Sequence, residues 1–250
     1  MKRALNLRWV SAGLLLALCA ALPVAWSQTL PLVTATSTKA GVQYAVPVQT
    51  LLSLTALSFL PAALMLMTSF TRILIVFSLL RQALGLQNLP PNMVLTGLAL
   101  FLTWFVMGPV LDNIYRDAYL PLAQGKLEFE QAVAAGAEPI RKFMLQFTRQ
   151  EDLNIFAKMY GAPIAARADT PMSVLVPAFA VSEIKTGFLI GFMIYLPFIA
   201  IDFAVASILT SLGMVMVSPM MFSLPLKLVI FALADGWTLL AASLVASYRI

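Results

Sequence analysis

The run from Ala178 to Val217 contains 40 residues that are almost all apolar, and it constrains the fold more than any other part of the sequence. A helix of this length would extend about 60 Å at ~1.5 Å per residue, whereas the hydrocarbon core of a bilayer is ~30 Å thick. Pro197 lies near the middle of the run, where its missing backbone N–H weakens a helix. We therefore expect a long helix kinked at Pro197 rather than one straight membrane span.

Composition indicates that the whole chain folds in a lipid environment. Of the 250 residues 61% are hydrophobic, against ~45–50% apolar residues in soluble domains. The formal net charge is +5, but Lys2, Arg3 and Arg8 lie at the extreme N-terminus, and without them 13 basic residues face 11 acidic ones. This near balance argues against a nucleic-acid-binding surface.

Side chains that many enzymes need are missing from the sequence. There is no His, and the single Cys is Cys19. If the N-terminal segment is cleaved, the mature chain has neither thiol nor imidazole, which excludes disulfides, Cys or His nucleophiles and His or Cys metal sites. We expect no enzyme activity, no cofactor and no metal.

The N-terminus has the pattern of a secretory signal peptide, which we assign to residues 1–27. Three basic residues precede the apolar run Trp9–Leu22, and Ala25–Ser27 offers the small side chains that signal peptidase requires. A retained first membrane helix is one alternative. A lipoprotein leader ending before Cys19 is a weaker one, because a bulky Leu precedes that residue.

Composition divides the mature chain into four parts. Residues 28–47 are expected to form an extended periplasmic lead-in and residues 48–111 a first membrane helix pair. Residues 112–171 are expected to form a charged helical periplasmic subdomain, and residues 172–250 a second helix pair with a Met-rich turn. In the first helix pair, Asn92 is expected to cap a helix from Met93 to Leu111. The second pair is expected to end in one apolar helix from Leu226 to Tyr248. Four crossings with a secreted N-terminus place the charged subdomain in the periplasm.

The charged subdomain contains 15 charged residues, eight acidic and seven basic. Pro139 can begin one helix, and Thr148 with Glu151 matches a capping box for another that ends near Gly161. Before this subdomain, Arg72 lies on a polar stripe of an otherwise apolar helix. That stripe marks either a helix end that reaches the headgroups or a face turned toward water or a partner.

Five ionisable residues lie in the apolar C-terminal segment, where desolvation is expensive: Glu183, Lys185, Asp202, Lys227 and Asp235. Such groups face a bundle interior, a partner subunit or a water path, unless they snorkel to the headgroups. In a simple hairpin that turns at Ser218, Asp202 and Lys227 would be about 20 Å apart along the axis. We therefore expect contacts between subunits rather than an Asp202–Lys227 bridge.

Two further patterns concern packing and closure. Gly187 and Gly191 form a Gly-x-x-x-Gly face that allows two helices to approach closely. Four methionines gather within eight residues at the turn between the two long helices: Met214, Met216, Met220 and Met221. They are either ordinary apolar filler or a soft surface that closes and yields to varied shapes.

Two other membrane functions could use some of these residues. Asp202 and Asp235 could form the carboxylate pair of an intramembrane protease, but the sequence Ala234-Asp235-Gly236-Trp237 lacks the Gly-x-Gly-Asp loop of such enzymes. A self-contained solute transporter should show paired repeats, and the two halves of this chain differ. The interrupted helix around Pro197 leaves the transporter open as an alternative.

The sequence resembles the FliP family, the export-gate component of the flagellar type III secretion system, and more distantly its injectisome relatives. The matching segments cover nearly everything from Pro47 to the C-terminus: Met67–Ile73, Leu79–Gly85, Pro90–Asn92, Gly97–Thr103, Pro177–Phe179, Ser182–Phe188, Pro197–Phe198, Ile201–Asp202, Ser223–Lys227 and Asp235–Trp237. The signal peptide and the charged subdomain favour the flagellar branch, and an injectisome homologue is the alternative.

The resemblance implies a pore subunit: an all-α membrane protein whose long kinked helix hairpins assemble helically around a pore for unfolded flagellar substrates. It implies several copies, five in the usual picture, with FliR and FliQ, and with FlhB and FlhA nearby, in the bacterial inner membrane at the flagellar basal body. It also implies that methionines of the turn form a gasket, foremost Met214 and Met216. Val215 stands where many relatives have a third Met.

Overall fold

The computed structural model describes residues 34–38, 41–45, 48–161, 167–214 and 216–248. The expected signal peptide at residues 1–27 and its cleavage site lie outside the described residues. The chain forms two compact units, Met1–Pro61 and Ala62–Ile250, and each is described by itself.

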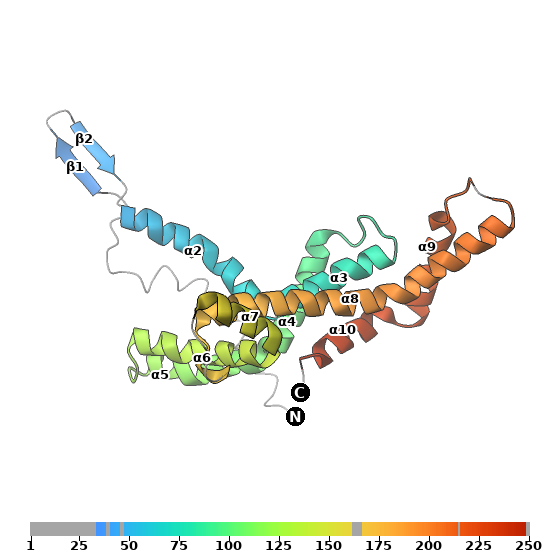
Figure 1. Ribbon diagram of the computed structural model, residues 1–250. Helices are drawn as coiled ribbons and strands as arrows, with labels where there is room; N and C mark the ends of the chain where they lie inside the picture. Colours follow the sequence, from blue (N-terminus) through green and yellow to red (C-terminus); the bar gives the residue numbers. More distant parts are fainter. Residues whose placement is uncertain (1–33, 39–40, 46–47, 162–166, 215, 249–250) are drawn as a thin grey trace, which may run out of the picture. The chain divides into compact units, whose positions relative to one another are not determined.

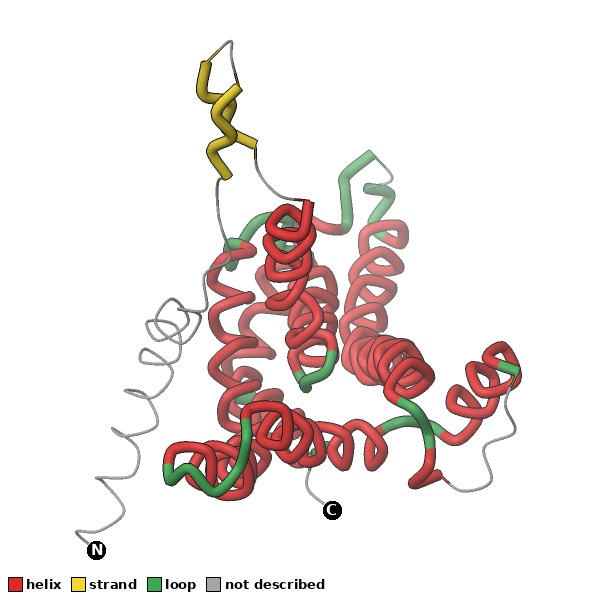
Figure 2. The backbone as a smooth tube through the Cα atoms, turned by 90° about the vertical axis from the view of Figure 1, so that its left-hand side faces the viewer, coloured by secondary structure: helices red, strands yellow, loops and turns green. Residues whose placement is uncertain are grey.

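In the N-terminal unit a β-hairpin precedes a helix. Strand β1 (Thr34–Thr38) pairs antiparallel with β2 (Gly41–Ala45), so that Thr34 lies opposite Ala45 (Figure 2, yellow). Helix α2 (Val48–Leu66) begins in this unit. The extended lead-in expected at residues 28–47 therefore contains paired strands where it is described, consistent with the β-branched Thr and Val residues of TATST and GVQYA.

In the larger unit, helices joined by turns and loops make up the described residues. Its elements, in chain order, are α3 (Phe70–Ala83), α4 (Asn92–Ile114), the π-helical turn η1 (Tyr115–Tyr119), α5 (Leu120–Ala123), α6 (Phe129–Phe147), α7 (Gln150–Tyr160), the 3-10 turn η2 (Arg167–Asp169), α8 (Met172–Ser211), α9 (Met220–Leu233) and α10 (Gly236–Ala246). Figure 1 shows α9 running back beside the C-terminal part of α8. The expectation of a helical membrane protein is confirmed at this level.

Among the described residues, two helices are long and apolar enough to cross a membrane, and the count rises to four if two broken pairs each form one span. The single spans are Asn92–Ala123 and Met172–Ser211. The broken pairs are Leu57–Leu66 with α3 and α9 with α10, and α9 and α10 meet at an angle of 64°. The continuous last helix expected from Leu226 to Tyr248 is therefore wrong, whereas α8 runs unbroken through Pro197.

Two hydrophobic clusters hold the larger unit together. One surrounds α3, where Ile73, Val76 and Phe77 meet residues of α4, α8 and α10. The other joins the first turns of α8 to α6, α7 and Tyr248. The second cluster contains residues of α6 and α7, which belong to the charged subdomain. This subdomain therefore packs on α8, the helix that carries Glu183 and Lys185.

Several local expectations for the helix ends were wrong. Pro139 lies inside α6, whose capping box is formed by Glu128 and Gln131. The N-cap of α7 is Arg149, without a side-chain hydrogen bond, and the Thr148 hydroxyl instead donates to the Met144 carbonyl at 2.6 Å. At these ends the burial of an amphipathic face outweighed the local capping pattern.

Two further ends can be compared with the sequence. Asn92 is the first residue of α4 rather than its cap, and its side-chain oxygen accepts a hydrogen bond from Arg81 Nη1 at 2.6 Å. The end of α7 at Gly161 is confirmed, with a left-handed φ of 77°.

Candidate functional site

A buried ion pair lies where α3 crosses α8. Arg72 Nη2 donates to Glu183 Oε1, and the side chains are 4% and 0% exposed. Removing two charges from water is costly, so the pair needs further polar partners. Arg72 itself is therefore buried within the chain rather than turned toward water.

The C-terminal end of the described chain supplies those partners. The Tyr248 hydroxyl donates to the second carboxylate oxygen of Glu183, and Arg72 Nη1 donates to Ser247 Oγ at 3.1 Å. The guanidinium carbon of Arg72 lies 4.0 Å from the centroid of the Tyr248 ring, a cation–π contact. Burial, and then the charge of Glu183, raise the pKa of Tyr248, so its hydroxyl keeps the proton that it donates.

Lys185 pairs with a different helix from its neighbour Glu183. Its ammonium donates to Asp152 Oδ1 in the first turn of α7. Nearby, the Ser182 hydroxyl accepts from the Arg149 backbone N–H at 2.8 Å, at the N-terminus of the same helix. Three side chains within one turn of α8, those of Ser182, Glu183 and Lys185, therefore attach it to α3, to α7 and to Tyr248, all within one chain.

Lys227 and Asp202 form an ion pair within the chain, so the expectation against such a bridge was wrong. Lys227 Nζ lies 2.6 Å from Asp202 Oδ2 and donates to the Ala83 carbonyl at 3.0 Å. Ala83 ends α3, so the ammonium also satisfies one of that helix's unpaired carbonyls. Lys227 is buried, whereas the Asp202 side chain is 40% exposed.

The error came from the position assumed for the turn. Helix α8 ends at Ser211, with Gly213 in the left-handed conformation at φ 76°, and α9 begins at Met220. Asp202 is therefore nine residues before one helix end and Lys227 seven residues after the other. At ~1.5 Å per residue these distances are about 14 and 10 Å, which puts the two side chains at nearly the same level.

Gly187 and Gly191 face α3 of the same chain, a partner that the spacing alone left open. A Cβ atom built at Gly187 would lie 3.2 Å from Ile75 Cβ. At Gly191 it would lie 2.2 Å from Leu79 Cδ1 and 2.9 Å from Leu79 Cβ, closer than real carbon atoms approach. The two glycines therefore set the distance between α3 and α8.

Asp235 lies at the break between α9 and α10 rather than on a helix face. Its φ and ψ are both 48°, and its Oδ1 accepts from the Thr238 hydroxyl at 3.0 Å. A Cβ atom at Gly236 would lie 2.2 Å from the Phe231 ring, so the last turn of α9 sits against the backbone of α10. We call residues Ala234–Gly236 the elbow; its bend is fixed by the left-handed conformation of Asp235 and by the packing of Phe231 on Gly236.

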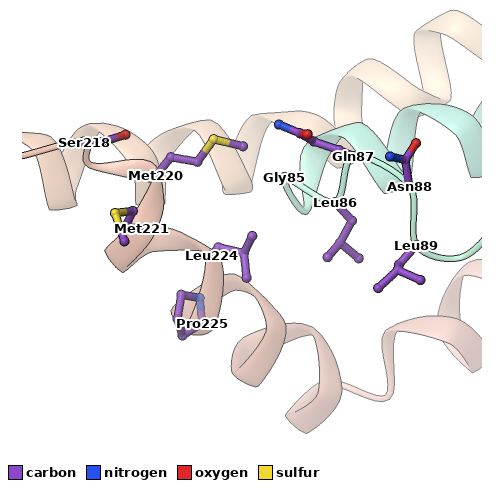
Figure 3. A pocket seen from close by; sticks show the side chains of 10 residues that line it. All are labelled: Gly85, Leu86, Gln87, Asn88, Leu89, Ser218, Met220, Met221, Leu224 and Pro225. Atoms are coloured by element: carbon purple, nitrogen blue, oxygen red, sulfur yellow. The ribbon is translucent and has the colours of Figure 1, made fainter.

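The four methionines differ in their surroundings. Met216 is fully exposed and Met221 is 74% exposed, while Met214 and Met220 are partly covered. A groove of about 540 Å³ separates the start of α9 from the loop after α3, and in Figure 3 Met220 extends across it toward Gly85. Its lining has no charged side chain and consists of Gly85, Leu86, Gln87, Asn88, Leu89, Ser218, Met220, Met221, Leu224 and Pro225.

Comparison with known proteins decides the family. A profile described as the FliP family matches residues 53–244, which include all four methionines and the five charged residues of the C-terminal segment. The chain belongs to the FliP family. The resemblance noted from the sequence motifs is thereby confirmed.

Members of the FliP family from distant bacteria match over most of this chain. The flagellar biosynthetic protein FliP of Pectobacterium carotovorum is 51% identical over 97% of this chain and 94% of its own length. The flagellar biosynthetic protein FliP of Bacillus subtilis is 50% identical over 80% of this chain and 91% of its own length. That of Buchnera aphidicola (Baizongia pistaciae) is 50% identical over 85% of this chain, which spans 59% of that longer FliP.

The partners of the buried charges were not visible in the sequence of this FliP family member. Arg72 and Glu183 are 111 positions apart, and Arg72 and Ser247 are 175 apart. A polar stripe and an isolated carboxylate in apolar runs were the only indications. Tyr248 and Asp152 were missed because aromatic and acidic residues at segment ends have many other roles.

Proposed function

We propose that the chain is a core pore subunit of the flagellar type III protein export gate, through which unfolded flagellar proteins pass. Several copies, five by the family resemblance, assemble with FliR and FliQ, near FlhB and FlhA. The complex lies in the bacterial inner membrane at the flagellar basal body, with the subdomain at residues 112–171 on the periplasmic side. The proposal is supported by the family membership, whose curated members are named for flagellar biosynthesis.

The unpaired apolar surface of the larger unit supports an assembled state. Large apolar side chains on α8 and α9 are more than half exposed in the single chain, among them Phe192, Phe203, Val229 and Leu233. Exposed apolar area of this extent is stable only against lipid or other subunits. The charges need no such partner, because Glu183, Lys185 and Lys227 are already paired. Helix faces, more than salt bridges, would therefore join the copies.

The single observation that carries the proposed closure is the position of the methionines. They lie at the free end of the α8–α9 hairpin. Met216 is fully exposed, so its side chain packs on no described residue of its own chain. Flexible thioether side chains can fill an irregular opening and yield when an unfolded chain enters it. We propose that Met214 and Met216 of neighbouring copies, supported by Met220 and Met221, form the gasket.

A paired replacement tests this gasket. We expect Met214→Ala/Met216→Ala to raise the ion conductance of membranes that contain the complete gate, because two soft side chains per copy are lost from the closure. The matched control is Met159→Ala/Met193→Ala, which removes two methionines that are also exposed but lie on α7 and α8. Conductance and the amount of co-purified complex are measured together.

An unchanged conductance in the turn variant, with the complex still assembled, would exclude the gasket role. The competing function, a self-contained transporter, is tested on the purified chain in liposomes. Saturable uptake of a solute by this polypeptide alone would contradict a pore subunit, which is expected to show none.

A further inference from the structure

Helix α9 is held differently from the other long helices of its unit. Its two buried residues, Ser223 and Lys227, are both polar, whereas α3 buries six apolar residues and Arg72. The Ser223 hydroxyl has no hydrogen-bond partner among the described residues. Because none of the apolar side chains of α9 is completely buried, the hydrophobic effect contributes little free energy to holding this helix against the rest of the unit.

The attachment of α9 is concentrated at two points. In the middle, Lys227 reaches Asp202 on α8 and the Ala83 carbonyl at the end of α3. At the far end, Phe231 packs against Gly236 and lies edge-on to Trp237, with ring centroids 5.4 Å apart. The first turn has no ion pair or aromatic contact among the described residues: Met220 extends across the groove toward Gly85 (Figure 3), and Ser223 is buried without a hydrogen-bond partner.

The elbow has the properties of a pivot. Asp235 is the only residue other than glycine with a positive φ in the part of the chain that the structure describes, and it interrupts the backbone hydrogen bonds between α9 and α10. Such a residue can absorb a change of backbone angles without disturbing the helices on either side. Helix α10 stays fixed, since Leu240 and Leu244 belong to the core around α3.

We propose that α9 is a hinged arm: it pivots at Asp235–Gly236, is held closed by the contacts of Lys227, and moves Met220 and Met221 when the gate opens. This inference rests on the proposed function, since the methionines must close a pore for the movement to matter. It assigns the opening motion to one helix. Helices α3, α8 and α10 form the fixed frame against which that helix moves.

A reversible crosslink across the groove tests the arm. Leu86 and Leu224 lie on its opposite walls (Figure 3), so Leu86→Cys/Leu224→Cys allows a thiol-cleavable bismaleimide to join the arm to the frame. All variants carry Cys19→Ser, which removes the single native thiol. The reagent is applied to cells with the assembled gate, so folding and assembly precede the crosslink. Secretion of flagellar proteins is then measured.

We expect crosslinking to lower secretion at least tenfold and cleavage of the reagent to restore it. The matched control, Asn88→Cys/Asn92→Cys, joins two positions on the frame side of the groove and should secrete normally. The two single-cysteine variants, Leu86→Cys and Leu224→Cys, carry the reagent without a link and should also secrete normally.

Normal secretion from a fully crosslinked gate would refute the proposal that α9 moves when the gate opens. Equal loss of secretion in the single-cysteine variants would overturn it as well, because added bulk would then be the cause. Failure of the arm is distinguishable from failure of the gasket. A leak from Met214→Ala/Met216→Ala together with normal secretion from the crosslinked gate leaves the gasket standing and removes the moving helix.

Discussion

A methyl group added at Gly191 tests the close crossing of α3 and α8. The added carbon in Gly191→Ala would lie 2.2 Å from Leu79 Cδ1 and 2.9 Å from Leu79 Cβ. Rotation of the Leu79 side chain can relieve the first contact. It cannot relieve the second, because the Cβ atom is fixed to the backbone, so the two helices must separate.

The magnitude follows from two opposing effects. Overpacking in a core costs about 1–3 kcal/mol, and a contact that moves the backbone belongs in the upper part of that range. Replacing Gly by Ala in a helix returns up to about 1 kcal/mol. The net loss of unfolding free energy for Gly191→Ala is therefore on the order of 1–2 kcal/mol.

Two other glycines complete the series. A Cβ atom built at Gly187 would lie 3.2 Å from its nearest neighbour, Ile75 Cβ. Gly187→Ala therefore requires a shift of a few tenths of an ångström and should be nearly neutral. A Cβ atom built at Gly108 would meet nothing from the rest of the described chain within 4 Å, so Gly108→Ala should be neutral or stabilising. It is the matched control for Gly191→Ala.

The assay is denaturant unfolding of the purified full chain in detergent, followed by circular dichroism. The expected order of stability is Gly108→Ala, then Gly187→Ala, then Gly191→Ala. Adding Leu79→Ala to Gly191→Ala should recover part of the loss, because it removes the atoms beyond Cβ. If Gly191→Ala were as stable as Gly108→Ala, the close contact between α3 and α8 would be refuted.

Two further predictions concern the buried polar groups. Tyr248→Phe removes a donor from the buried Glu183 carboxylate and should lower the unfolding free energy by about 1–3 kcal/mol in the same assay, whereas Tyr160→Phe on an exposed ring should change it little. Asp202→Ala leaves the buried Lys227 ammonium with a backbone carbonyl alone, so it should impair assembly and motility more than Asp202→Ala/Lys227→Met does. Equal stability of the two tyrosine variants, or normal motility of Asp202→Ala, would contradict the respective role.

Much of the larger unit could be predicted from local patterns in the sequence. The apolar runs predicted α4 and α8, and the gathering of methionines predicted a distinctive turn between two long helices. The end of α7 at Gly161 was visible because a left-handed residue after a helix favours glycine. These features depend on neighbouring residues, so a single sequence contains the information.

The charged partners could not be predicted in the same way. A shift of the helix ends by a few residues was enough to misplace Lys227 relative to Asp202. The break at the elbow was hidden for a related reason. Ala234 and Gly236 occur in continuous apolar helices as well, and the packing of Phe231 on Gly236 shows where this helix turns.

The sequence by itself determined that this is a helical membrane protein of the FliP family with a soft, methionine-bearing turn. Composition and motifs depend on residue types, and these are read directly. Only the tertiary structure decided that Arg72, Glu183 and Tyr248 meet, and that α3 supplies the surface for Gly187 and Gly191. Those contacts join residues far apart in the chain, and their distances depend on how helices cross, which no local pattern records.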